Sequence, residues 1–468
     1  MQVLLNTFRL YSLIFTIVTE GLLIDFIRLK RIKTPEGKKI LLDKISKKIV
    51  SILPKFGPAF IKTGQFLATR PDIVGDIVSR NLEKLQDSLP TCDFSQINAI
   101  LSKSIAINEF KYIDHVAVAA ASIAQVHKAE TINNEVVAIK VLKPGIEAKF
   151  KSNLSLLRFV GRLTQKIFNV KRLKIEEVIS RIEKTSLLEM DLRIEAASAD
   201  KLRENLIHDE NVYVPKIFWK YTTNNILVLE WIDGIPLYDR ERLLSAGFNI
   251  ESIVKKFAVT FFNQAYRDGF FHADLHPGNV LVNANEDIIF LDFGIMGHLD
   301  HMNKLFIAEI LKSFLERNYD LVAKLHLEAG YFPKSESINV FALSCRSIGE
   351  TVLNKPPNQV SISALLKQLF ETAKNFNMEI QAPLLLLQKT MMTVEGISIY
   401  LDDQTNIWLL IKPWIKKWAK SNLGIRGRLL KNTNNAENFV KDIVDIVSLG
   451  KKHLIRLQQK HTKSQKLY

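Results

Sequence analysis

The chain has 468 residues, with 64 lysine or arginine and 49 aspartate or glutamate residues, and its formal net charge is +15. Apolar residues make up 47% and charged residues 24%, a globular composition that excludes a disordered or fibrous protein. Two cysteines, Cys92 and Cys345, exclude a disulfide scaffold and a multi-cysteine zinc site. The charge leaves two partners to consider, nucleic acid and an anionic membrane surface, beside a generally solvated basic surface.

Residues 1–110 have a helical pattern, and the first thirty are apolar. Glu20 and Asp25 interrupt this apolar run before it reaches the roughly 20 residues that a bilayer span needs. We therefore expect an amphipathic or buried helix there, followed by dense basic charge over residues 28–48. No segment of the chain is predicted to be a transmembrane helix.

The pattern changes after residue 110. Ser122–Glu130 and Val136–Val141 have the alternation typical of strands, and Asn133-Asn134 marks a turn between them. Helical periodicity returns over residues 150–207 and is followed by an apolar strand, Ile226–Trp231, which ends at Asp233-Gly234. The strands Ser122–Glu130 and Val136–Val141 and the turn between them predict a hairpin.

From Glu251 the pattern is helical, with one short strand pair, Val280–Val282 and Ile288–Leu291, before a helical region that runs from residue 302 to the end. The most informative residues flank that pair. Asp274 and Asn279 lie in the loop before the first strand, and Asp292 follows the second. They match His-x-Asp-x-x-x-x-Asn and Asp-Phe-Gly, the catalytic loop and metal motif of kinases. Phosphoryl transfer needs one carboxylate at the acceptor, and an amide oxygen with a second carboxylate to hold Mg²⁺.

A lysine upstream completes this set. Val137-Ala-Ile-Lys140 ends on the second hairpin strand and matches the lysine that binds the α- and β-phosphates of ATP. Such a lysine needs a carboxylate partner on a helix, and position alone leaves three candidates, Glu189, Asp191 and Glu195.

Two features differ from ordinary protein kinases. The phosphate loop, expected to be glycine-rich, contains no glycine and is predicted to be stiffer. Its residues, which we expect to contact the nucleotide, are Val118, Ala119, Ala120, Ala121, Ser122, Ile123, Ala124, Gln125 and Val126. A helical pattern also resumes near Asp300–Met302, which leaves no room for a peptide-binding activation segment.

Lys62 and Gln65 lie in an otherwise apolar helical stretch of the N-terminal region. A buried lysine is costly unless it is paired, and Glu189 or Asp191 could supply the partner. An ordinary amphipathic helix is the alternative.

These motifs together resemble the UbiB family of atypical kinase-like ATPases, which is linked to ubiquinone biosynthesis. The resemblance covers roughly residues 8–450 and depends on motifs in a fixed order. They are Lys62-Thr-Gly-Gln65, the Ala119–His127 loop, Val137–Lys140, Glu189-Met-Asp191 with Glu195-Ala-Ala, His272–Asn279 and Asp292-Phe-Gly294.

The resemblance implies an α+β, helix-rich, two-lobed protein-kinase-like fold with an N-terminal helical extension that carries the Lys-x-Gly-Gln motif. It implies that Lys62 pairs with Glu189 and gates the site together with Gln65 and Asp191, and that Glu195 pairs with Lys140. The cofactors implied are ATP and Mg²⁺. The domains we expect are a helical extension (1–110), an N-lobe with a helical insertion (111–231), a C-lobe (232–400) and a basic helical tail (401–468).

The leading hypothesis is an Mg²⁺-dependent ATPase or phosphotransferase with Asp274 as the base. The alternatives are a nucleotide-sensing scaffold without catalysis and a small-molecule or lipid kinase. Bacterial family members often end in two transmembrane helices, and we expect none here. The charge then indicates a peripheral position at an anionic membrane surface. The resemblance implies the cytoplasmic face of the bacterial inner membrane, with ubiquinone precursors or biosynthetic enzymes as partners. We expect no nucleic acid as a partner, because the sequence shows no nucleic-acid-binding motif.

Overall fold

The computed structural model describes residues 15–16, 18–68, 74–82, 84–85, 91–168, 175–333, 335–353, 362–378, 381–403 and 407–422. The chain divides into two compact units, Met1–His298 with Ile380–Asp403, and Leu299–Glu379 with Gln404–Tyr468. The four domains predicted from the sequence remain a prediction. All of the candidate site residues belong to the first unit.

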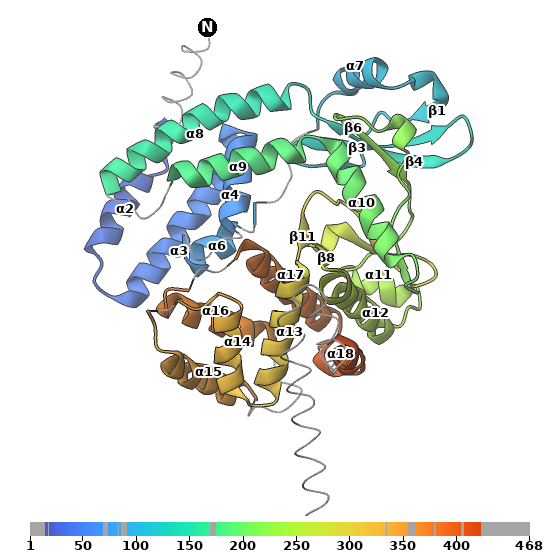
Figure 1. Ribbon diagram of the computed structural model, residues 1–468. Helices are drawn as coiled ribbons and strands as arrows, with labels where there is room; N and C mark the ends of the chain where they lie inside the picture. Colours follow the sequence, from blue (N-terminus) through green and yellow to red (C-terminus); the bar gives the residue numbers. More distant parts are fainter. Residues whose placement is uncertain are drawn as a thin grey trace, which may run out of the picture. The chain divides into compact units, whose positions relative to one another are not determined.

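The first unit begins with a helical group, shown in blue in Figure 1. Prolines occupy the first position of two of its helices, where the missing N–H costs no hydrogen bond. The elements are α2 (Leu22–Arg31), α3 (Pro35–Ile52), the short 3₁₀ helix η1 (Leu53–Phe56), α4 (Pro58–Ala68) and α6 (Asp76–Leu82). Leu22, Ile45 and Ile52 form a buried cluster that joins α2 to α3.

A five-stranded antiparallel sheet follows. Its strands are β1 (Phe110–Ile113), β2 (Ala119–Ala120), β3 (Ala124–Thr131), β4 (Val136–Leu142) and β6 (Ile226–Glu230), in the order β1-β3-β4-β6 with β2 paired to β3. The predicted hairpin is confirmed as β3–β4, and Asn134 in its turn has φ 65°. Two further short strands, β1 and β2, were not predicted. One face packs on α7 (Phe94–Ser104), which is followed by η2 (Ile107–Glu109).

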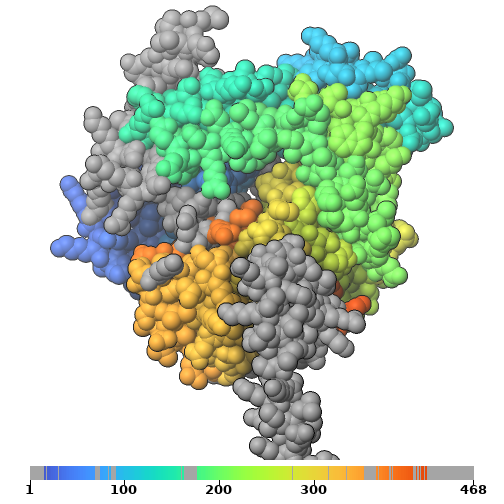
Figure 2. All heavy atoms as spheres, viewed as in Figure 1, coloured from blue at the N-terminus to red at the C-terminus, as the bar shows by residue number. Residues whose placement is uncertain are grey.

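Three long helices connect β4 to the rest of the unit. They are α8 (Ile146–Phe168), α9 (Ile175–Glu189) and α10 (Leu192–Leu206). α4 packs against α8 and α9, which lie side by side in Figure 1, so the N-terminal group is joined to these helices. In the space-filling view, the atoms of α8, α9 and α10 make one continuous teal-to-green surface (Figure 2).

Two small sheets carry the catalytic motifs. One has the order β5 (Val212–Tyr213), β10 (Ile288–Phe290), β9 (Val280–Val282) and β7 (Ile235–Pro236), and the other pairs β8 (Phe270–His272) with β11 (Met296–His298). The predicted pair of Val280–Val282 with Ile288–Leu291 is confirmed as β9–β10, but the expectation that it is the one strand pair of this region was wrong. The β8–β11 pair was overlooked because each strand has only three residues, too few to show a period. The accompanying helices are η3 (Trp219–Tyr221), α11 (Arg240–Ser245), α12 (Ile250–Phe262), the π-helix η4 (Asn263–Asp268), η5 (Pro277–Asn279) and α17 (Ala382–Leu401).

The second unit is helical where the structure describes it. It contains α13 (His301–Leu315), α14 (Tyr319–Glu328), α15 (Ile338–Leu353), α16 (Ile362–Asn375) and α18 (Ile407–Asn422). The predicted basic tail beyond Asn422 lies outside the described residues. Among the helices of the described ranges, none has both the length and the hydropathy to cross a membrane. The helix-rich α+β class predicted from the sequence is confirmed.

Candidate active site

His272, at the end of β8, fixes the loop that carries Asp274. The ring is fully buried, and its Nδ1 accepts a hydrogen bond from the Asp274 N–H at 3.2 Å. Its Nε2 then donates to the carbonyls of Leu291 at 3.1 Å and Asp292 at 2.8 Å. One imidazole therefore links the backbone of the two motifs, which places the two aspartates on neighbouring segments.

Asn279 connects the same two segments a second time. Its Nδ2 donates to the Asp274 carbonyl at 3.1 Å, and its own carbonyl accepts from the Leu291 N–H at 2.8 Å. With Nδ2 occupied in this way, the side-chain oxygen is the atom left to act as a ligand. The loop, which contains the short helix η5, is held to the second motif by these hydrogen bonds.

Asp292 has φ 55°, a left-handed conformation that few non-glycine residues adopt. Backbone strain of this kind collects at functional sites. The Lys140 Nζ lies 3.2 Å from its Oδ1, which also accepts from the Gly294 N–H at 3.2 Å. Burial opposes the negative charge, but the Lys140 ammonium and the Gly294 N–H outweigh it and lower the pKa of Asp292 to about 2. This carboxylate is ionised at neutral pH.

Lys140 on β4 lies between two carboxylates. Its Nζ is 2.7 Å from Glu195 Oε1, and both side chains are nearly buried, with 12% and 8% exposed. Burial disfavours the ammonium, but Asp292 and Glu195 raise the pKa of Lys140 above its usual range. Burial raises the pKa of Glu195, and the lysine partly offsets this. Of the three partners that the sequence left open, the structure brings Glu195 to Lys140.

Lys62 on α4 forms an ion pair with Glu189 at the end of α9, with 2.7 Å between Nζ and Oε2. Asp191 does not take this place, because it caps the N-terminus of α10 and binds the Arg193 guanidinium at 2.6 Å. Gln65 makes a long contact of 3.5 Å from its Nε2 to the Leu85 carbonyl. The two lysine–glutamate pairs are those that the family resemblance implies.

The alanine loop is a tight turn between β2 and β3. The Ala121 N–H donates to the Ala124 carbonyl at 2.8 Å, and the Lys143 ammonium donates to the Ala121 carbonyl at 2.7 Å. Ser122 is 1% exposed, so its hydroxyl does not project into solvent. Gln125 is equally buried, and its Oε1 accepts from the Cys92 N–H at 2.7 Å. Gln125 therefore joins the loop to Cys92 from within, and neither of the two polar side chains lies at the surface.

One residue at this site was missed by the sequence reasoning. Lys389 on α17 places its Nζ 3.6 Å from Asp274 Oδ1, with 34% and 37% of the two side chains exposed. The sequence does contain a signal for this residue, because Lys389, like Lys62, is a lone lysine in a largely apolar helical stretch.

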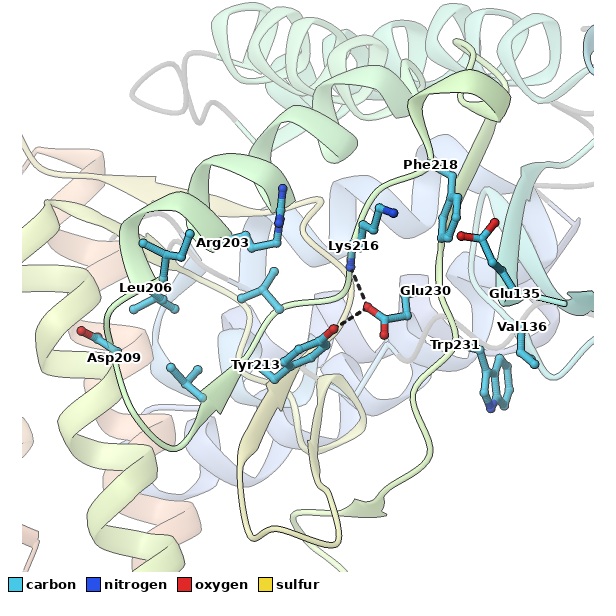
Figure 3. A pocket seen from close by; sticks show the side chains of 13 residues that line it. Glu135, Val136, Arg203, Leu206, Asp209, Tyr213, Lys216, Phe218, Glu230 and Trp231 are labelled. Carbon is cyan, nitrogen blue, oxygen red and sulfur yellow. Dashed lines mark hydrogen bonds between the residues drawn. The ribbon is translucent and has the colours of Figure 1, made fainter. Parts of the chain in front are cut away.

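A cavity of about 660 Å³ lies elsewhere, between the C-terminal part of α10 and the end of β6. Figure 3 shows the Glu230 carboxylate at its centre, where it accepts hydrogen bonds from the Tyr213 hydroxyl at 2.7 Å and the Lys216 N–H at 3.1 Å. None of the four catalytic candidates, Lys140, Asp274, Asn279 and Asp292, lines it.

The donor set of the catalytic loop suits magnesium. Asn279 and Asp292 provide an amide and a carboxylate oxygen, which hard cations prefer, and Mg²⁺ is commonly held by one or two such groups together with substrate phosphates. In the described part of the chain, no three or more His, Cys, Asp and Glu side chains cluster as a metal cage would require. The residues present therefore fit a metal that is shared with a phosphate ligand.

Comparisons with known proteins identify the family of the chain. Residues 84–326 match the ABC1 atypical kinase-like domain, and residues 345–406 match the UbiB helical domain. A protein named "Probable protein kinase UbiB" from Marinobacter nauticus (strain ATCC 700491 / DSM 11845 / VT8) is 36% identical over 414 residues, which cover 87% of this chain and 76% of that protein. The Rv3197–erythromycin complex from Mycobacterium tuberculosis matches at a TM-score of 0.52 and 22% identity, covering 78% of this chain and 94% of that chain, and supports the fold. The chain belongs to the UbiB family of atypical kinase-like proteins.

Proposed function

We propose that this protein is an Mg²⁺-dependent ATPase or phosphotransferase that supports ubiquinone biosynthesis. The observation that carries the proposal is the Lys140 ammonium, which lies 2.7 Å from Glu195 and 3.2 Å from Asp292. A buried cation that is already paired on two sides is positioned to bind the phosphates of a nucleotide beside a metal-binding carboxylate.

Each residue of the set has a distinct role in this proposal. Lys140 binds the α- and β-phosphates and is positioned by Glu195. Asn279 and Asp292 hold Mg²⁺, which when bound neutralises charge on the phosphate oxygens. Asp274 orients the acceptor oxygen and takes its proton, and the backbone of Val118–Val126 covers the phosphates.

The acceptor is small in this proposal, either water or a small molecule. α13 begins at His301, capped by Asp300, soon after Gly294. The short connection supports the expectation that no peptide-binding activation segment is present between these residues. Lys62, with Gln65, gates the site through Glu189, because α9 leads directly into α10 and Glu195.

The place of action is part of the same proposal. The family resemblance favours ubiquinone biosynthesis, and the exposed basic residues of the N-terminal helices favour a peripheral position at an anionic membrane surface on the cytoplasmic face of the bacterial inner membrane. Ubiquinone precursors or biosynthetic enzymes are the partners that this position would bring within reach.

The test is ATP turnover by the purified chain with Mg²⁺, with and without anionic liposomes. Asp274→Asn should lower the turnover number by about 100-fold or more while nucleotide binding remains, because a general base is lost but no phosphate contact is. Asp320→Asn, which changes an exposed aspartate on α14, is the matched control. Equal turnover by Asp274→Asn and the wild type would refute the proposed role of Asp274.

A further inference from the structure

Lys389 belongs to α17, a helix that lies far from the Asp274 loop in the sequence but close to it in the fold. α17 packs against α12 and β11, and β11 pairs with β8, whose last residue is His272. Within α17 the stretch from Ala382 to Val394 contains one charged residue, Lys389. Its side chain is about one-third exposed, so the ammonium is partly desolvated and is stabilised by a partner of opposite charge.

The partner in the structure is Asp274, but the contact is loose. The Nζ–Oδ1 distance is 3.6 Å and about a third of each side chain is exposed. By contrast, the Lys140–Glu195 pair is at 2.7 Å with 12% and 8% exposed. Exposed ion pairs of the first kind contribute at most about 1 kcal/mol to stability. The fold therefore gains little from Lys389, and the ammonium remains free to exchange Asp274 for a stronger anion.

We infer that Lys389 is a binding residue for the terminal phosphate of a nucleoside triphosphate. This rests on the proposed function, because it places the transferred group beside Asp274. The site then has two lysines with different tasks. Lys140, which is nearly buried and paired on two sides, binds the inner phosphates, while Lys389, about one-third exposed and loosely paired, binds the phosphoryl group that is transferred.

The step balances with Lys389 protonated throughout. The bond between the γ-phosphorus and the β,γ-bridging oxygen breaks, and ADP leaves with the electron pair. A bond forms between the γ-phosphorus and the acceptor oxygen, and the acceptor proton passes to Asp274. The Lys389 ammonium donates to a non-bridging oxygen of the transferred group and offsets its charge beside the Asp274 carboxylate.

A contact between Lys389 and the terminal phosphate makes binding selective for a triphosphate, whereas a purely structural role of Lys389 does not. A residue that contacts the terminal phosphate distinguishes a triphosphate from a diphosphate. A residue that only positions the loop would affect both nucleotides alike. Calorimetric binding of Mg²⁺ with either a non-hydrolysable ATP analogue or ADP separates the two cases.

The variants are Lys389→Met, which keeps the apolar stem, and Lys389→Arg, which keeps the charge. Lys255→Met, an exposed lysine on the neighbouring helix α12, is the control. Lys389→Met should weaken the ATP analogue by about tenfold, as expected for the loss of one charged hydrogen bond, and leave ADP within about twofold. Lys389→Arg should recover most of the lost affinity, and Lys255→Met should match the wild type for both ligands.

The outcomes separate this inference from the proposed function. If the wild type binds both nucleotides and Lys389→Met loses neither or loses both equally, the inference is overturned and the proposed function stands. If the wild type binds no nucleotide, both are overturned. Selective loss of the ATP analogue, with recovery in Lys389→Arg, supports the inference.

Discussion

Lys62 and Glu189 form a largely buried ion pair, with 2.7 Å between Nζ and Oε2 and 14% and 15% of the side chains exposed. Glu189 ends α9, and Glu195, the partner of Lys140, lies in the first turn of α10. The junction between these helices therefore connects Lys62 of the N-terminal helices to Lys140 on the sheet. Only six positions along the chain separate the partners of the two lysines, Glu189 and Glu195.

The first prediction concerns this pair. Lys62→Met alone should lower the free energy of unfolding by about 3 kcal/mol, because the Glu189 carboxylate would remain poorly solvated without its partner. Glu189→Gln alone should have a similar cost. The double variant should be more stable than the sum of the single changes predicts, and urea denaturation of all four proteins measures this coupling. Strictly additive losses would show that the contact contributes nothing of its own.

The second prediction concerns Gly64, beside Gln65 in α4. A Cβ at this position would lie 2.2 Å from Leu85 Cδ1 and 2.9 Å from Leu53 Cδ1. Gly64→Ala should therefore cost about 1–3 kcal/mol through overpacking, despite the better helix propensity of alanine.

Gly396 in α17 is the matched control, because a Cβ there would meet nothing within 4 Å. Gly396→Ala should stabilise the protein by about 0.5–1 kcal/mol. Thermal unfolding of the two variants separates packing from propensity. A stabilised Gly64→Ala variant would mean that α4 is not packed as described.

Residue type and spacing predicted four residues that the structure brings together. Lys140, Asp274, Asn279 and Asp292 were found because phosphoryl transfer restricts both residue type and spacing along the chain. The β3–β4 hairpin was found because it has a clear period and an asparagine turn.

The rest depends on contacts that spacing does not encode. Residue order could not choose among three carboxylates for Lys140, since all lie on or beside the same two helices. Lys389 follows Asp274 by 115 positions in the sequence, and the packing of α17 brings the two side chains together. The sequence predicts that Ser122 and Gln125 contact the nucleotide, but both side chains are buried in the structure.

The third prediction concerns pH and Asp292. Its pKa in the folded protein is about 2, below the 3.8 of an unperturbed aspartate. The ionised form stabilises the fold, and this stabilisation is complete above the unfolded value and is lost as the pH falls from about 4 towards 2. The difference in unfolding free energy between the wild type and Asp292→Asn should be constant near neutral pH and shrink across that window.

Denaturation by urea at stepped pH measures this difference directly. Asp320→Asn serves again as the exposed control, for which we expect no comparable change. A wild-type advantage over Asp292→Asn that stays constant down to pH 2 would contradict the Lys140–Asp292 interaction.

The fourth prediction concerns the basic N-terminal segment and an anionic membrane. Not all of its lysines are available to a membrane, since Lys48 is bound to Asp25 at 2.7 Å and Lys47 to Asp43 at 2.7 Å. Arg31, Lys33, Lys38 and Lys39 are exposed. The exposed charge that could meet lipid headgroups is therefore densest around the start of α3, and Lys44 adds an exposed lysine further along the helix.

Neutralising Lys30, Arg31, Lys33, Lys38 and Lys39 together should weaken binding to phosphatidylserine-containing liposomes at low salt. Each basic residue near such a surface contributes about 1 kcal/mol, so a loss of about 100-fold or more is expected. Neutralising the same number of exposed lysines elsewhere, at Lys103, Lys149, Lys201, Lys255 and Lys324, lowers the net charge equally. If the two variants lose binding to the same extent, the attraction depends on total charge. A larger loss for the N-terminal set means that the positions matter, because screening confines the interaction to charges within about 10 Å of the membrane.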